Sequence, residues 1–105
     1  MPASLPGVRL TPRAQDDLEE IWRYTARTWS ERQADDHIDE LMRVFAAIAA
    51  MPAMAPRYDE FRPPVRIHVH GTQLIVYDDA DGSISVVRVL GARQDWRSVL
   101  ASVKP

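Results

Sequence analysis

The 105-residue sequence predicts an α+β fold in which a helical hairpin packs on a four-strand antiparallel sheet, in the order β-α-α-β-β-β with a short C-terminal helix. Three observations lead to this prediction. Two apolar stripes with helical spacing follow one another with almost no loop between them. Short β-branched segments joined by turn residues come next along the chain. A last apolar stripe near the C-terminus again has helical spacing.

The two long helices are predicted from their caps and stripes. Thr11-Pro12 provides an N-cap and a proline at the first helical position, and Ser30 with Gln33 forms a capping box for the second helix. Met51-Pro52 ends the second helix. Because almost no loop separates the helices, we expect an antiparallel hairpin. The stripes are Ala14, Leu18, Ile21, Trp22, Thr25 and Trp29, then Ala34, Ile38, Leu41, Met42, Phe45, Ile48 and Ala49, with Trp22 and Phe45 expected in the core.

The sheet is predicted from a short first strand, Val8–Leu10, and a meander of three strands at Val65–His70, 74–77 and Ser83–Gly91. A proline-rich connection, 52–64, separates the helices from the meander. Asp95 is expected to cap the final helix, whose apolar face carries Trp96, Val99, Leu100 and Val103.

Arg88 is a charged residue within the β-branched strand Ser83–Gly91. Simple alternation places it on one face with Ile84, Val86 and Leu90. Because an unpaired buried guanidinium is very costly, Arg88 is expected to pair with an acid or to open into a groove.

Arg66 lies on a strand that also flanks 74–77, so Arg66 and Arg88 are placed to face the same groove. Two interpretations stay open, a structural ion pair with Asp78 or Glu60 and a role in binding a target.

Composition excludes several classes of site. The chain has no cysteine, so disulfides, thiolate metal sites and cysteine nucleophiles are absent. Residues 1–56 carry six arginines and nine acids, a net charge of −3, and residues 57–105 carry seven bases and six acids, a net charge of +1. A dedicated nucleic-acid binder is usually clearly basic, and this chain is not. A metal site at His68 and His70 needs further ligands that the sequence does not offer, so no metal or cofactor is predicted.

We expect a single domain over residues 1–105. The N-terminus lacks a basic region followed by an apolar run, and nowhere do about 18 apolar residues run together. No signal peptide or membrane contact is therefore predicted, and the expected location is the cytoplasm.

Short sequence segments that together carry a resemblance to a known family are spread over nearly the whole chain. They are Leu10-Thr11, Ala14, Asp17-Leu18, Ile21-Trp22, Tyr24, Gln33-Ala34, Leu41, Phe45, Ile48-Ala49-Ala50, Pro52, Arg66-Ile67, Leu74-Ile75-Val76-Tyr77, Ile84 and Arg88-Val89-Leu90. In this order and spacing the chain resembles the RelE/ParE superfamily of type II toxin–antitoxin toxins, and it is more similar to the ParE-like branch.

The resemblance implies a toxin that inhibits DNA gyrase and that a cognate, ParD-like antitoxin neutralises in a hetero-oligomer, with operator DNA bound only through the antitoxin. One alternative is a RelE-like ribosome-dependent mRNA endonuclease. Another is a non-toxic member that only binds its antitoxin. Many members end the last strand with a histidine after Arg-Val-Leu, whereas this chain continues Leu90-Gly91-Ala92-Arg93-Gln94, which argues against the nuclease.

The candidate site residues follow from these alternatives. For the gyrase inhibitor no catalytic residue is predicted, and the target-binding candidates are Arg66, Arg88, Arg93, Trp96 and Arg97. For the nuclease, Arg66 and Arg88 would stabilise the phosphorane and His68 would act as the base. Solvated strand positions for His68 and His70, and a purely structural Trp96, are the simpler interpretations.

Overall fold

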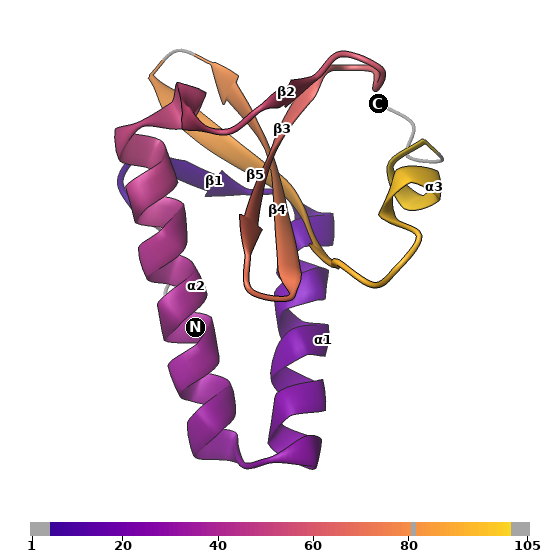
Figure 1. The fold of residues 1–105 in the computed structure, drawn as a ribbon. Helices are drawn as coiled ribbons and strands as arrows, with labels where there is room; N and C mark the ends of the chain where they lie inside the picture. The colour runs from indigo at the N-terminus through magenta and orange to yellow at the C-terminus, as the bar shows by residue number, and fades with distance from the viewer. Residues whose placement is uncertain (1–4, 81, 102–105) are drawn as a thin grey trace.

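The computed structural model describes residues 5–80 and 82–101 (Figure 1). Two long antiparallel helices lie beside a twisted sheet, and a short third helix lies apart from them near the C-terminal end of the described chain (Figure 1). The elements are β1 Val8–Leu10, α1 Pro12–Thr28, α2 Glu31–Ala50, the 3₁₀ helix η1 Pro52–Met54, β2 Arg57–Tyr58, β3 Val65–His70, β4 Gln73–Ala80, β5 Ser83–Gly91 and α3 Trp96–Ala101.

The predicted caps begin both helices of the hairpin. Thr11 Oγ1 accepts a hydrogen bond from the Ala14 amide at 3.1 Å, and Ser30 Oγ accepts one from the Gln33 amide at 3.0 Å. These bonds satisfy amides that have no partner inside a helix. The buried stripes of α1 and α2 then pack with one face of the sheet in a first core cluster, which includes Leu18, Leu41, Phe45, Ile75, Tyr77, Ile84, Val86 and Val89.

The sheet has five strands in the order β1-β5-β4-β3-β2, and β1 runs parallel to β5. The prediction of four antiparallel strands was wrong in this detail. Antiparallel pairing is enforced only where a tight turn joins two strands, and here the whole helical hairpin separates β1 from the meander. The additional strand, β2, has two residues and lies within the proline-rich connection, so it is too short to show an alternating pattern.

A β-bulge changes which side chains of β5 share a face. Tyr77 pairs with Val86 whereas its neighbour Val76 pairs with Arg88, so Val87 is an extra residue in β5. Val86 therefore lies in the first core cluster and Leu90 in a second cluster on the opposite face. The prediction that Ile84, Val86, Arg88 and Leu90 share one face was wrong for this reason.

The second core cluster lies on the face of the sheet away from the helical hairpin. It joins residues of β3, β4 and β5 with Phe61 and with Leu100 of α3, and Tyr58, Trp96 and Val99 pack against it. The C-terminal helix thus covers this face as its predicted stripe requires, although Val103 lies outside the described residues. Within the described part of the chain, no helix is both long enough and apolar enough to cross a bilayer.

Candidate functional site

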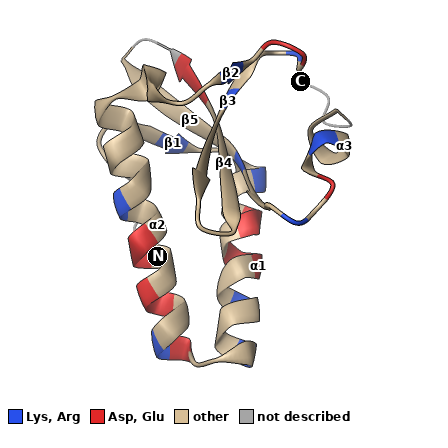
Figure 2. Ribbon diagram, viewed as in Figure 1, with Lys and Arg blue, Asp and Glu red and all other residues tan. Residues whose placement is uncertain are grey.

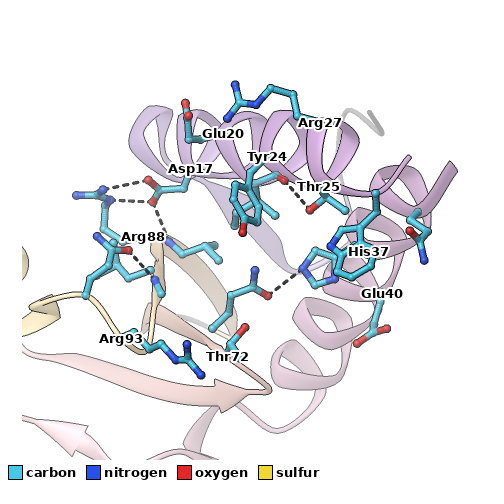
Figure 3. A pocket seen from close by; sticks show the side chains of 18 of the residues that line it. Asp17, Glu20, Tyr24, Thr25, Arg27, His37, Glu40, Thr72, Arg88 and Arg93 are labelled. Atoms are coloured by element: carbon cyan, nitrogen blue, oxygen red, sulfur yellow. Dashed lines mark hydrogen bonds and ion pairs between the residues drawn. The ribbon is translucent and has the colours of Figure 1, made fainter. Parts of the chain in front are cut away.

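A groove of about 1230 Å³ lies between the helical hairpin and the neighbouring ends of β4 and β5 (Figure 3). Its apolar lining includes Ile21, Val89 and Leu90, and the aromatic residues Tyr24 and Trp29 also line it. Tyr24 is 59% exposed and Trp29 is 69% exposed, so neither contributes its full apolar surface to the core. Exposed aromatic side chains beside an apolar groove are typical of a surface that a partner covers.

Charged side chains of both signs also line the groove. Acidic positions recur along both helices of the hairpin (Figure 2), and Glu20, Asp36 and Glu40 line the groove from these helices. Arg93 lines it from the segment after β5 and is exposed. Of the five predicted target-binding residues, only Arg88 and Arg93 line this groove.

Arg88 is held by Asp17 of α1 in a two-point ion pair. Arg88 Nε donates to Asp17 Oδ2 at 2.8 Å and Nη2 donates to Oδ1 at 3.0 Å (Figure 3). Asp17 Oδ2 also accepts the Val89 amide at 2.8 Å, and both charged side chains are only 14% exposed. The hydrogen bonds to Asp17 raise the pKa of Arg88. The acid that pairs with Arg88 is thus Asp17, not Asp78 or Glu60, and it fixes α1 to β5.

Arg66 forms a second, separate ion pair. Its Nε donates to Asp79 Oδ1 at 3.0 Å, and its Nη1 donates to the Ala55 carbonyl at 2.7 Å. Arg66 pairs across the sheet with Tyr77 and Arg88 with Val76, and these two β4 residues lie in opposite core clusters. The prediction that Arg66 and Arg88 face one groove was therefore wrong, because the bulge reverses the side on which Arg88 lies.

The two histidines of β3 have different surroundings. His70 Nε2 lies 2.5 Å from Glu40 Oε2 of α2, and this hydrogen bond together with the charge of His70 lowers the pKa of Glu40. On the same helix, His37 Nε2 lies 3.1 Å from Gln73 Oε1. These two contacts tie the tip of the β3–β4 hairpin to α2. His68 is half-buried, so it is not the fully solvated position that one interpretation of the sequence expected.

His68 leads to a prediction about pH. Burial first, and then the charge of His70, lower the pKa of His68. The unfolded chain therefore binds a proton more readily than the folded one, and His68 costs stability as pH falls below about 6.5. Replacing His68 with glutamine should flatten the fall of the melting temperature between about pH 7 and pH 5, measured by circular dichroism. Equal slopes of melting temperature against pH for the parent and the variant would contradict the lowered pKa of His68. Glu40 does not interfere with this comparison, because its lowered pKa affects stability at more acid pH.

Trp96 and Arg97 form part of the packing of α3. The Trp96 ring meets the Tyr58 ring edge-on with centroids 5.9 Å apart, and the Arg97 guanidinium lies 4.5 Å from the Trp96 centroid. Arg97 also pairs with Glu60. This arrangement favours the structural interpretation of Trp96, since its ring closes the second core cluster.

Comparison with known proteins decides the family. A family model described as "ParE toxin of type II toxin-antitoxin system, parDE" matches residues 8–96. This chain belongs to the ParE toxin family. Toxin ParE1 of Mycobacterium tuberculosis is 39% identical over 87 residues, which cover 82% of this ParE-family chain and 89% of the relative. Toxin ParE1 of Caulobacter vibrioides is 30% identical over 92 residues, which cover 88% and 95% of the two chains.

A solved structure supports the same ParE-type fold. A chain of the "Chromosomal ParDE TA system from P. aeruginosa" superposes with a TM-score of 0.69 and covers 81% of this chain and 94% of its own length. Only 13% of the aligned residues are identical, so this likeness concerns the fold alone.

Sequence reasoning missed two features of this ParE-family site. Asp17 was not assigned to Arg88, because 71 residues separate the pair and no local pattern links them. Trp29 was placed on the core stripe of the first helix, whereas it follows the last helical residue and is exposed. Tyr24 carried a usable signal, since it is an aromatic residue outside that stripe.

Proposed function

We propose that this ParE-family toxin inhibits DNA gyrase and that a cognate ParD-like antitoxin neutralises it in a hetero-oligomer. The choice of gyrase over messenger RNA as the target rests on one observation, the separation of Arg66 from Arg88, the two arginines that a nuclease would use. Arg66 and Arg88 are each held by a carboxylate. Their cross-strand partners in β4, Tyr77 and Val76, lie in core clusters on opposite faces of the sheet. Metal-free phosphodiester cleavage needs a base and cations that converge on one phosphate. This geometry supports a protein that acts by binding.

The groove is the surface that best fits this binding role. Tyr24 and Trp29 offer large exposed apolar area, and Arg93 adds an exposed cation for which the described residues hold no partner. Aromatic residues and arginine are the residue types most enriched where binding energy concentrates. We infer that the antitoxin neutralises the toxin by covering this groove, and that operator DNA is contacted only through the antitoxin. We propose the bacterial cytoplasm as the location of the toxin, because DNA gyrase and the operator DNA of the antitoxin are found there.

The proposed function is tested with purified toxin freed from its antitoxin, in two parallel assays. One assay follows gyrase supercoiling of relaxed plasmid, and the other follows cell-free translation with primer extension on the messenger. We expect supercoiling to be lost while the messenger stays intact, and added antitoxin to restore supercoiling. Cuts in the messenger with normal supercoiling would instead establish the RelE-like alternative. Normal supercoiling together with an intact messenger would identify a non-toxic antitoxin-binding protein.

A further inference from the structure

The tip of the β3–β4 hairpin, residues 69–73, forms one wall of the groove and has no apolar anchor of its own. Thr72 and Gln73 line the groove from this tip. Every residue from Val69 to Gln73 is exposed or half-buried, and the first buried residue of β4 is Leu74. Segments with few buried apolar contacts open at a low cost in free energy. Polar contacts with neighbouring elements therefore determine where the tip lies.

The side of the tip that faces α2 is held by two side-chain contacts. His70 and Gln73 pair with each other across the turn. His70 Nε2 lies 2.5 Å from Glu40 Oε2, and Gln73 Oε1 lies 3.1 Å from His37 Nε2. His37 and Glu40 are one turn apart on α2, and both line the groove (Figure 3). Each contact thus uses a histidine, the side chain whose charge ordinarily changes near neutral pH.

The opposite side of the tip is held by main-chain contacts that pH does not alter. The Ala92 amide donates a hydrogen bond to the Thr72 carbonyl at 2.8 Å, and Gln73 pairs with Gly91 of β5. Main-chain amides and carbonyls keep the same charge across the pH range of a folded protein. A change in the charge of His70 would therefore loosen the tip from α2 and leave it attached to β5.

The contact with Glu40 is the one whose strength depends on charge. The hydrogen bond with His70, and then the charge of His70, lower the pKa of Glu40. Glu40 thus stays ionised to more acid pH in the folded chain, and the ion pair is complete wherever His70 carries its proton. As pH rises past about 6.5, where histidines ordinarily lose their proton, the charge of the pair is lost and only a weaker hydrogen bond remains.

Other charged and titratable side chains surround this pair, on α2, on β3 and after β5. They are Asp36, His37 and Arg43, then His68, and then Arg93. Carboxylates and guanidinium groups ordinarily keep their charge near neutral pH, so only the three histidines of this set change charge there. His37 contacts the uncharged Gln73, and among the described residues no hydrogen bond joins His68 to α2. This leaves His70 as the histidine that makes an ion pair between the tip and α2.

We propose that the tip of the β3–β4 hairpin is a pH-sensitive latch on one wall of the groove. Protonated His70 fastens the tip to Glu40 of α2, and neutral His70 loosens it while the bond to Ala92 holds. The effect of the latch on the toxin rests on the proposed function, in which the antitoxin covers this groove. The latch itself is a property of the free toxin, so the two proposals can fail separately.

The direct test is amide hydrogen exchange at the tip, measured by NMR on the free toxin and expressed relative to an unstructured chain at the same pH. The His70 and Gln73 amides should be about threefold better protected at about pH 6 than at about pH 8, the effect of a partly exposed ion pair. Equal protection at both pH values overturns the latch and leaves the proposed function intact. The Ile75 amide, in the buried centre of β4, reports opening of the whole sheet. An equal change there would assign the effect to global stability and overturn the latch.

Two variants each remove one charge of the pair. His70→Gln keeps an N–H donor that cannot gain a proton, and Glu40→Gln keeps an acceptor oxygen without the charge. In both variants the protection of the tip should become the same at the two pH values. His68→Gln is the matched control, because it removes the neighbouring histidine of β3 and should keep the threefold difference of the parent. Persistence of the difference in His70→Gln, or its loss in His68→Gln, would overturn the latch, with circular dichroism confirming that each variant is folded.

Discussion

Replacing Asp17 with alanine is expected to lower the free energy of unfolding by roughly 3 kcal/mol, because it leaves the Arg88 guanidinium buried without its partner. The carboxylate accepts three hydrogen bonds, two from Arg88 and one from the Val89 amide, and both charged side chains are largely buried. Breaking such a pair costs far more than the pair contributes, since the remaining charge stays desolvated. Urea denaturation followed by circular dichroism measures this loss.

The adjacent residue provides the matched control. Asp16 lies on the same turn of α1 and is exposed, so Asp16→Ala should change the stability by less than about 0.5 kcal/mol. The double variant Asp17→Ala/Arg88→Met should be more stable than the sum of the single effects predicts, because it removes both charges together. A loss at Asp17 no larger than at Asp16 would contradict the view that this pair fixes α1 to β5.

The helical half of the fold could be predicted from the sequence because its determinants are local. A cap, its amide partner and the stripe that follows it lie within one or two turns of each other. Thr11 and Ser30 cap the predicted helices, and Phe45 lies in the predicted core. Local signals of this kind need no knowledge of what lies across the sheet.

The candidate site could be predicted only in part, because non-local contacts determine it. The parallel pairing of β1 with β5 and the bulge at Val87 both depend on how distant segments meet. The bulge matters most, since one extra residue moves Leu90 to the face opposite Val86 and separates Arg88 from Arg66. Alternation alone assigns both arginines to a common surface. The structure instead gives each one a structural partner.

Replacing both Tyr24 and Trp29 with alanine should raise the dissociation constant of the antitoxin complex at least about 30-fold, equivalent to about 2 kcal/mol. Both side chains line the groove, and both are more than half exposed in the free toxin, so covering them removes new apolar surface from water. For the same reason the double variant should fold with nearly unchanged stability. Isothermal titration calorimetry with the purified antitoxin measures the change.

A matched pair of exposed apolar residues follows the C-terminal end of α2. Met51 is 64% and Met54 48% exposed, and neither lines the groove. If exposed apolar area alone governed binding, Met51→Ala/Met54→Ala would weaken the antitoxin complex as much as the aromatic pair does. If the groove is the docking surface, the methionine variant should bind within about twofold of the parent, since single exposed apolar residues outside an interface contribute little. Equal losses in the two variants would show that the weakening is not specific to the groove, and would contradict its assignment as the docking surface.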